Sequence, residues 1–260
     1  MNPPRSMDEI IEAFGIDILK RGADLQVTPA GDLAVTADGD LRIGSIPFNA
    51  MFRLAQRWRF QEPVAKQLFS TVMEAFAIEA DLEREINASG FADLSKPPLR
   101  EPTLDDARRF QEIGDHQGAL INGRGAAGGA AMVMLGGMLA RFCDDLGLKG
   151  GPGKHGPPAF AGHSFGAVVQ AAANSFRHHD EWARTKRPRD QQLVSMICIC
   201  EVLEASDQPK PWGGNWVFAV RYNLCGELLR TVSDGTFENL GANLFEYAKS
   251  LAAGQASAST

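Results

Sequence analysis

The sequence contains no Cys-x-x-Cys pair, although it has four cysteines, at positions 143, 198, 200 and 225. Cys198 and Cys200 are two residues apart in an apolar run, so on a helix they would point to different faces. This spacing argues against a zinc site and favours reduced, buried thiols, which are typical of cytosolic proteins. We therefore expect a protein that needs neither a metal nor a cofactor.

A leader segment and a membrane-spanning run are also missing. No positively charged stretch followed by an apolar one opens the chain, and no run of about 18 apolar residues is present. We expect a cytoplasmic protein with no membrane partner. The net charge of −6 argues against broad binding of nucleic acid through the field of the whole protein.

An eight-residue repeat occupies residues 24–44. The three copies read Asp24-Leu-Gln-Val-Thr, Asp32-Leu-Ala-Val-Thr and Asp40-Leu-Arg-Ile-Gly. Each copy alternates apolar and polar residues, and turn residues separate the copies, so the pattern predicts a three-stranded antiparallel β-meander. Strands this short need helices beneath one face. The aspartates are interpreted as turn residues, because a calcium loop would need a denser array of oxygen ligands.

Helical periodicity dominates the remaining sequence, so the predicted fold class is mainly α: a helical bundle with a small N-terminal three-stranded antiparallel β-meander. Capping-box patterns at residues 6–9 and 103–106 predict two helix starts. Residues 1–100 are expected to hold a helix, the meander and two further helices, with apolar stripes in 48–58 and 64–82. Residues 101–251 are expected to form a helical domain, and 252–260 a disordered tail.

The segment Gly162-His-Ser-Phe-Gly166 matches the G-x-S-x-G nucleophile elbow, which would make Ser164 the nucleophile of a serine hydrolase. An elbow follows a buried strand, and the sequence before Gly162 is rich in glycine and proline. The general-base histidine should also lie well downstream, whereas His178 and His179 belong to the helix that the elbow would begin. A helix N-cap at Ser164 is the favoured interpretation.

A second glycine motif, Gly123-Arg-Gly-Ala-Ala-Gly128, matches the G-x-G-x-x-G fingerprint of dinucleotide-binding proteins. The residues before it make a poor strand. Its small residues are better suited to the close approach of another helix, and a break or kink near Gly123 is expected.

The densest group of polar side chains lies in residues 170–182. A helix over this stretch places Gln170, Asn174, Arg177, His178 and Glu181 on one face, opposite an apolar face that includes Phe165 and Phe176. Asn174 and His178 are four residues apart and therefore neighbours. An imidazole there could act as a general acid or base near neutral pH, and an arginine could hold a phosphate.

This segment, Ala173-Asn-Ser-Phe-Arg-His178, resembles the motif of HEPN-type proteins. In that family an arginine, a polar residue and, further on, a histidine lie on one helix, and many members are ribonucleases of toxin and phage-defence systems. Asn174 and His178 are in register with the motif. Ala173 stands at the arginine position, and Arg177 lies one turn later. The resemblance covers at most residues 103–251 and implies an all-helical domain, commonly paired across a homodimer.

Two classes of function follow. As an enzyme, the chain would cleave RNA without a metal, with His178 as general acid or base, Asn174 orienting the phosphate and Arg177 stabilising its charge. As a catalytically inactive helical module, it would bind protein or RNA through the same residues, with Gln170 and Glu181 in the binding surface and Trp182 as an apolar anchor. Both hypotheses stay open here.

Overall fold

The computed structural model describes residues 4–36, 39–88, 101, 103–149, 156–184, 189–204 and 223–258. This part of the chain contains seven α-helices, one short 3₁₀ helix and one two-stranded sheet. The α-helices are α1 (Met7–Ala13), α2 (Ile46–Ala88), α3 (Leu104–Asp145), α4 (Phe165–Arg184), α5 (Asp190–Val202), α6 (Cys225–Val232) and α7 (Phe237–Ala258). The remaining elements are the 3₁₀ helix η1 (Asp17–Lys20) and the strands β1 (Ala159–Phe160) and β2 (His163–Ser164).

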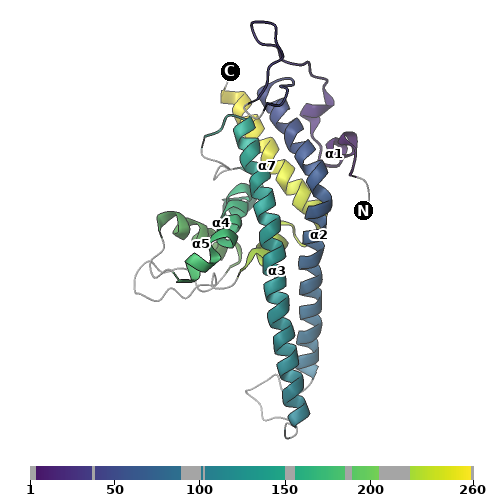
Figure 1. The fold of residues 1–260 in the computed structure, drawn as a ribbon, viewed down its shortest axis with the longest axis vertical. Coiled ribbons are helices and arrows are strands. Elements are labelled where there is room, and N and C mark those ends of the chain that lie inside the picture. The colour runs from purple at the N-terminus through teal and green to yellow at the C-terminus, as the bar shows by residue number, and fades with distance from the viewer. Residues whose placement is uncertain are drawn as a thin grey trace.

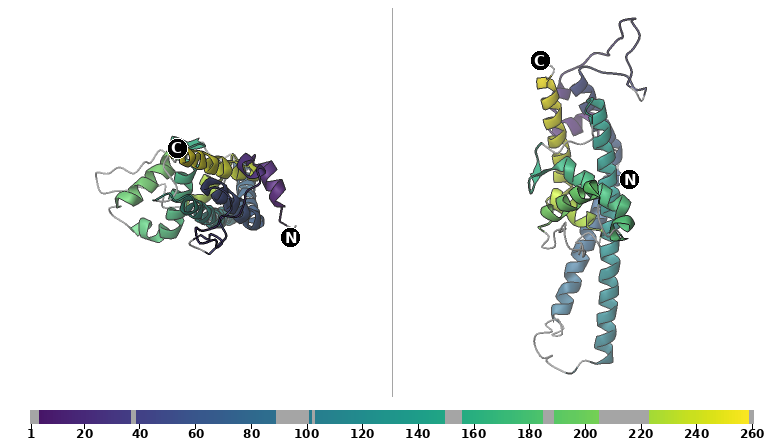
Figure 2. Two further views of the ribbon diagram at one scale, coloured as in Figure 1. Left: turned by 90° about the horizontal axis from the view of Figure 1, so that it is seen from above. Right: turned by 90° about the vertical axis from the view of Figure 1, so that its left-hand side faces the viewer.

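The two longest helices, α2 and α3, lie side by side as an antiparallel hairpin (Figures 1 and 2). Their distal halves extend beyond the other helices, while α4, α5, α6 and α7 gather around the other half (Figure 1). The boundary predicted near residue 100 therefore falls in the sequence between the end of α2 and the start of α3. Core residues from both sides of the boundary belong to one continuous hydrophobic cluster.

Capping chemistry begins two of the helices as predicted. The Ser6 hydroxyl accepts a hydrogen bond from the Glu9 amide, and the Glu9 carboxylate accepts one from the Ser6 amide. Thr103 and Asp106 make the same reciprocal pair at the start of α3. The first helix is shorter than its pattern suggests, because Gly15 adopts a φ of +56° and ends it.

The apolar stripes predicted over 48–58 and 64–82 lie on one helix, α2, which continues through Pro63. A proline inside a helix removes one backbone hydrogen bond. Tertiary packing holds the helix together on both sides of it, because Trp58 and Phe69 are buried against the aromatic ring of Phe237 from α7. The Trp58 and Phe237 ring centroids are 5.7 Å apart and nearly parallel.

The predicted three-stranded meander is wrong. The only sheet in the described residues is the antiparallel pair of β1 and β2, and residues 24–44 form three isolated β-bridges instead. The bridges pair Leu25 with Ile43, Val27 with Leu33, and Val35 with Leu41. In a meander the first and third segments would not pair, whereas here each repeat is bridged to both of the others.

We call residues 24–44 the repeat ring, because the backbone hydrogen bonds between the centres of its three segments form a closed cycle. Gln26 donates to the carbonyl of Arg42 at 3.0 Å, Arg42 to that of Ala34 at 2.9 Å, and Ala34 to that of Gln26 at 2.8 Å. Segments interrupted by a turn every eight residues are too short for a ladder. Closing the ring removes the edge strands of a meander and gives each central amide a partner.

The glycine-rich stretch of α3 does not break the helix, which is continuous through Gly123. Its glycines admit neighbouring elements: a Cβ atom on Gly128 would lie 2.5 Å from the backbone nitrogen of Gly226 on α6. A Cβ atom on Gly129 would collide with the Phe176 ring of α4. Close helix approach is thus the role of these small residues, and the predicted kink is wrong.

The C-terminal segment predicted as a disordered tail, 252–260, is helical as far as Ala258, and residues 259–260 lie outside the described part. Alanine is the strongest helix former, and this end of α7 is rich in it.

Among the described helices, α3 is the one that is long and apolar enough to cross a membrane by length and composition. Slightly more than half of its most apolar window, 56 %, is buried against the rest of the protein.

Candidate functional site

The helix that carries the predicted site, α4, begins at a tight hairpin. β1 and β2 pair through Ala159–Ser164 and Phe160–His163, and the Ser164 hydroxyl then accepts a hydrogen bond from the Ala167 amide at 3.2 Å. Ser164 is buried and acts as the N-cap of α4, as favoured from the sequence. The hydroxyl of the G-x-S-x-G motif is therefore used to begin a helix.

The apolar face predicted for α4 is the face that packs into the core. Phe165, Val168, Val169 and Ala172 are fully buried, and Phe176 is half-buried against Gly129 of α3. The opposite face is therefore directed away from α3. This orientation decides where the predicted site residues lie.

Two of the predicted site residues are engaged in the interface between α4 and α5. The Gln170 amide donates to Oδ1 of Asn174 at 2.9 Å, and Nδ2 of Asn174 donates to the Ser195 hydroxyl at 3.4 Å. Ser195 is buried on α5. The Asn174 amide thus serves as a bridge between two helices.

The other polar residues of the predicted site face solvent. Arg177, His178 and Glu181 are exposed, and Nδ1 of His178 lies 3.3 Å from a Glu181 carboxylate oxygen. His178 also departs from helical geometry, with φ −118° and ψ 16°. No hydrogen bond or ion pair among the described residues joins Asn174 to His178 or Arg177.

Trp182 is buried, with 2 % of its surface exposed, so its indole is a core group in the single chain. The structure therefore pairs Gln170 with Asn174 and His178 with Glu181. It does not gather Asn174, Arg177 and His178 around a common point.

A histidine–carboxylate pair that the sequence analysis did not single out lies at the start of α4. Nε2 of His163, in β2, is 2.5 Å from a carboxylate oxygen of Glu201 near the end of α5. The two residues are 38 positions apart in the sequence, which hides the pair from any pattern based on spacing. Glu201 holds this imidazole nitrogen, so the pair ties the β1–β2 hairpin to α5.

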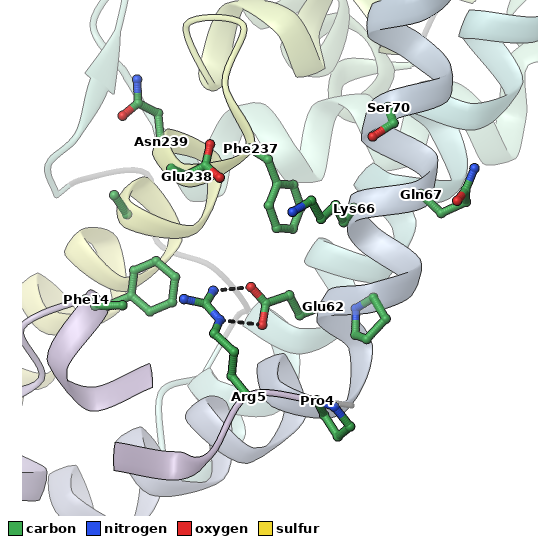
Figure 3. Close-up of a pocket in the computed structure, with 13 residues that line it drawn as sticks. Pro4, Arg5, Phe14, Glu62, Lys66, Gln67, Ser70, Phe237, Glu238 and Asn239 are labelled. Atoms are coloured by element: carbon green, nitrogen blue, oxygen red, sulfur yellow. Dashed lines mark hydrogen bonds and ion pairs between the residues drawn. The ribbon is translucent and has the colours of Figure 1, made fainter. Parts of the chain in front are cut away.

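A cavity of about 730 Å³ lies beneath the N-terminal arm, between α1, α2 and the start of α7 (Figure 3). Arg5 crosses it and forms a two-point ion pair with Glu62 of α2, with an Nε–Oε2 distance of 2.9 Å. The hydrogen bond to Glu62 raises the pKa of Arg5 above its ordinary value. The Arg5 guanidinium also lies 5.2 Å from the centre of the Phe14 ring.

The ion pair between Arg5 and Glu62 neutralises the charges of both side chains inside the cavity. Nε of Arg59 donates to the Arg5 carbonyl at 2.6 Å and fixes the arm further. The arrangement is that of a short segment of chain docked on a helix. Among the described residues, no group of three or more His, Cys, Asp or Glu side chains is placed to hold a metal ion.

The repeat ring is the other unusual surface. Of its six paired apolar side chains, five are between 45 % and 64 % exposed, namely Leu25, Val27, Leu33, Val35 and Leu41. These five are half of the large apolar side chains that the described residues expose. Large exposed apolar patches mark interaction sites in soluble proteins.

The polar side of the ring faces the helices. Arg53 of α2 donates to the Thr36 hydroxyl at 2.9 Å and pairs with Asp40, and Asn49 accepts a hydrogen bond from the Ile43 amide at 3.2 Å. One face of the repeat does contact a helix, as expected, but it does so through polar groups, and five of the apolar side chains remain largely exposed to solvent.

Three comparisons with known proteins found no relatives of this chain: no family model, no curated protein and no solved structure matches it.

Proposed function

We propose that this chain is a non-catalytic helical interaction module that binds a partner protein through the apolar side chains of its repeat ring. The observation that carries the proposal is the exposure of Leu25, Val27, Leu33, Val35 and Leu41 on one small, closed element. Complete burial of an exposed leucine or valine side chain contributes about 1.5–3 kcal/mol, and each of these five, at 45–64 % exposure, can still gain roughly half of that. A partner that covers these five side chains therefore has a substantial source of affinity.

The ring is held in place before any partner arrives. Arg53 and Asn49 anchor it to α2, and its central amides are already bonded to one another. A surface that is ordered in advance loses little conformational entropy on binding. The long α2–α3 hairpin then holds the ring at one end of an elongated body (Figure 1).

The alternative, RNA cleavage through His178, Asn174 and Arg177, has less support. General acid–base catalysis needs its groups to converge on one reacting centre. The Asn174 amide is bonded to Gln170 and Ser195, while His178 is paired with exposed Glu181. Nucleic acid is also disfavoured as the ring's partner, because the chain is acidic overall.

Affinity capture with a matched pair of variants tests the module. The ring variant carries Leu25→Ser, Leu33→Ser and Leu41→Ser, one change in each repeat. The control variant carries Leu104→Ser and Val194→Ser, which are 67 % and 53 % exposed outside the ring. We expect a protein retained by the wild type and the control but not by the ring variant. With the purified partner, the ring variant should bind roughly 100-fold more weakly, since each lost anchor removes more than about 1 kcal/mol.

Two outcomes would contradict the proposal. One is an identical set of captured proteins for the wild type and the ring variant. The other is cleavage of labelled RNA by the purified protein in the presence of chelator that disappears in the His178→Ala variant, because that result would make the chain a ribonuclease.

A further inference from the structure

We propose that one partner of the repeat ring is a second copy of this chain, which receives the ring on an exposed stripe of α2 formed by Phe60 and Val64. This inference rests on the proposed function and adds the identity of the bound surface. It is carried by two complementary surfaces, one acidic and apolar, the other basic and apolar.

The ring is the acidic member. Its 21 residues include four aspartates, at positions 24, 32, 38 and 40, and a single basic residue, Arg42. Asp40 is paired with Arg53, whereas Asp24 and Asp32 are exposed in the described structure and carry the negative charge that a second copy can meet. The five solvent-facing apolar side chains are therefore carried on an element with an excess of negative charge.

The α2 stripe is the basic member. Phe60 and Val64 are 63 % and 56 % exposed, and residues four apart on a helix lie next to each other. The Arg59 guanidinium lies 5.2 Å from the centre of the Phe60 ring.

The only carboxylate in residues 57–69 is turned away from this stripe. Glu62 is 8 % exposed and is paired with Arg5. Arg57, on the other side of the stripe, is paired with Asp145 at 2.7 Å. The exposed charge beside Phe60 and Val64 is consequently positive, which complements the ring.

The contact must form between copies. Asn49 and Arg53 hold the ring at the start of α2, and its apolar side chains remain exposed in the single chain. Each copy therefore offers one donor surface and one acceptor surface. Two copies that exchange both contacts form a two-fold dimer, and copies that exchange one contact at a time form chains or closed rings of subunits.

Charge complementarity steers association and discriminates between partners more than it adds affinity. A ring-to-ring dimer would bring two acidic elements together, which opposes that arrangement. The ring-to-stripe contact brings Asp32 or Asp24 towards Arg59. Reversal of one charge should therefore weaken the association, and reversal of both should restore it.

Sedimentation velocity of the full chain, from roughly 1 to roughly 200 μM, tests the inference, since a small interface binds in the micromolar range. We expect the average mass to rise with concentration from that of the monomer to that of a dimer or a larger assembly. The Phe60→Ser/Val64→Ser variant and the triple ring variant should both stay monomeric over this range. Val194→Ser is the matched control and should associate like the wild type, and circular dichroism verifies that each variant is folded.

The charge exchange identifies the pairing. Asp32→Lys and Arg59→Glu should each weaken association by roughly three- to tenfold, and the double variant should recover most of the loss. A wild-type protein that stays monomeric throughout would overturn the inference. Association that survives Phe60→Ser/Val64→Ser would also overturn it, because the ring would then have another acceptor. Neither result contradicts the proposed interaction module. That proposal would be contradicted only if no protein were captured through the ring.

Discussion

Arg124 on α3 and Glu227 on α6 are joined by two hydrogen bonds, from Nε at 2.9 Å and from Nη2 at 2.7 Å, to the same carboxylate oxygen. Arg124 is 8 % exposed, pairs in addition with Glu79 of α2, and lies 4.5 Å from the centre of the Phe76 ring. One side chain therefore links three helices at the middle of the molecule. The Arg230 guanidinium lies 4.9 Å from the same ring centre.

Replacement of Arg124 by methionine should lower the free energy of unfolding by about 3–5 kcal/mol, because two carboxylates would lose their counter-ion in a largely buried place. Urea denaturation measures this change. Arg109→Met is the control: Arg109 pairs with Glu85 across the distal part of the hairpin, where both are exposed, and little change is expected. Equal losses in the two variants would show that Arg124 is no more important than a surface ion pair.

Two glycines of α3 should respond in opposite ways to alanine. In Gly128→Ala the new Cβ atom would lie 2.5–2.7 Å from backbone atoms of Cys225 and Gly226, so α6 must move away, at a loss of about 1–3 kcal/mol. In Gly137→Ala no atom lies within 4 Å of the new Cβ, and alanine should stabilise the helix by roughly 0.5–1 kcal/mol. Thermal melting measures both. A stable Gly128→Ala variant would mean that α6 is not closely docked.

Buried thiols should make the protein lose stability in alkali. Burial raises the pKa of Cys143 to about 11, and those of Cys198 and Cys225 to about 12, from an ordinary 9.0. Above pH 9 the unfolded chain releases these thiol protons while the folded chain retains them. Folding then binds protons, and the stability present below pH 9 falls as the pH rises.

The measurement is urea denaturation of the wild type and of a Cys143→Ala/Cys198→Ala/Cys225→Ala variant between about pH 8 and about pH 10.5. The variant should have lower stability at pH 8, from the lost packing, but a shallower decline with pH. Parallel declines would assign the alkaline sensitivity to other groups.

Arg53→Met should release the repeat ring from α2. Arg53 bonds Thr36 and Asp40 on the ring, whereas Asp145 keeps its second partner, Arg57. The amides of Gln26, Ala34 and Arg42 should exchange with deuterium at least about tenfold faster, and those of buried α2 residues should be unaffected. Unchanged exchange at the three ring amides would show that the ring is stable without its anchor.

Several local features of the fold could be predicted from the sequence. The capping boxes at Ser6 and Thr103 and the N-cap at Ser164 depend on residues three apart, so short-range chemistry specifies them. The buried face of α4 follows from helical periodicity. The mainly helical class was predicted for the same reason.

The candidate site could be predicted only in part. Helical spacing placed Gln170, Asn174, Arg177, His178 and Glu181 on one face and made Asn174 and His178 neighbours, whereas the structure pairs Gln170 with Asn174 and His178 with Glu181. Spacing could not show that Ser195, 21 residues further on, takes the Asn174 amide, or that Glu201 takes His163. Such partners depend on how α5 packs on α4, which no spacing within one helix encodes.

The sequence alone therefore determined the helices, their caps, their apolar faces and the eight-residue repeat. The tertiary structure decided what the repeat becomes: its segments are too short to form a ladder, so they close into a ring through contacts between all three copies. It also decided which side of that ring meets the helices. Arg53 and Asn49 of α2 hold the polar side, and the apolar side remains in solvent, because only the folded chain brings residues from α2 against the repeat.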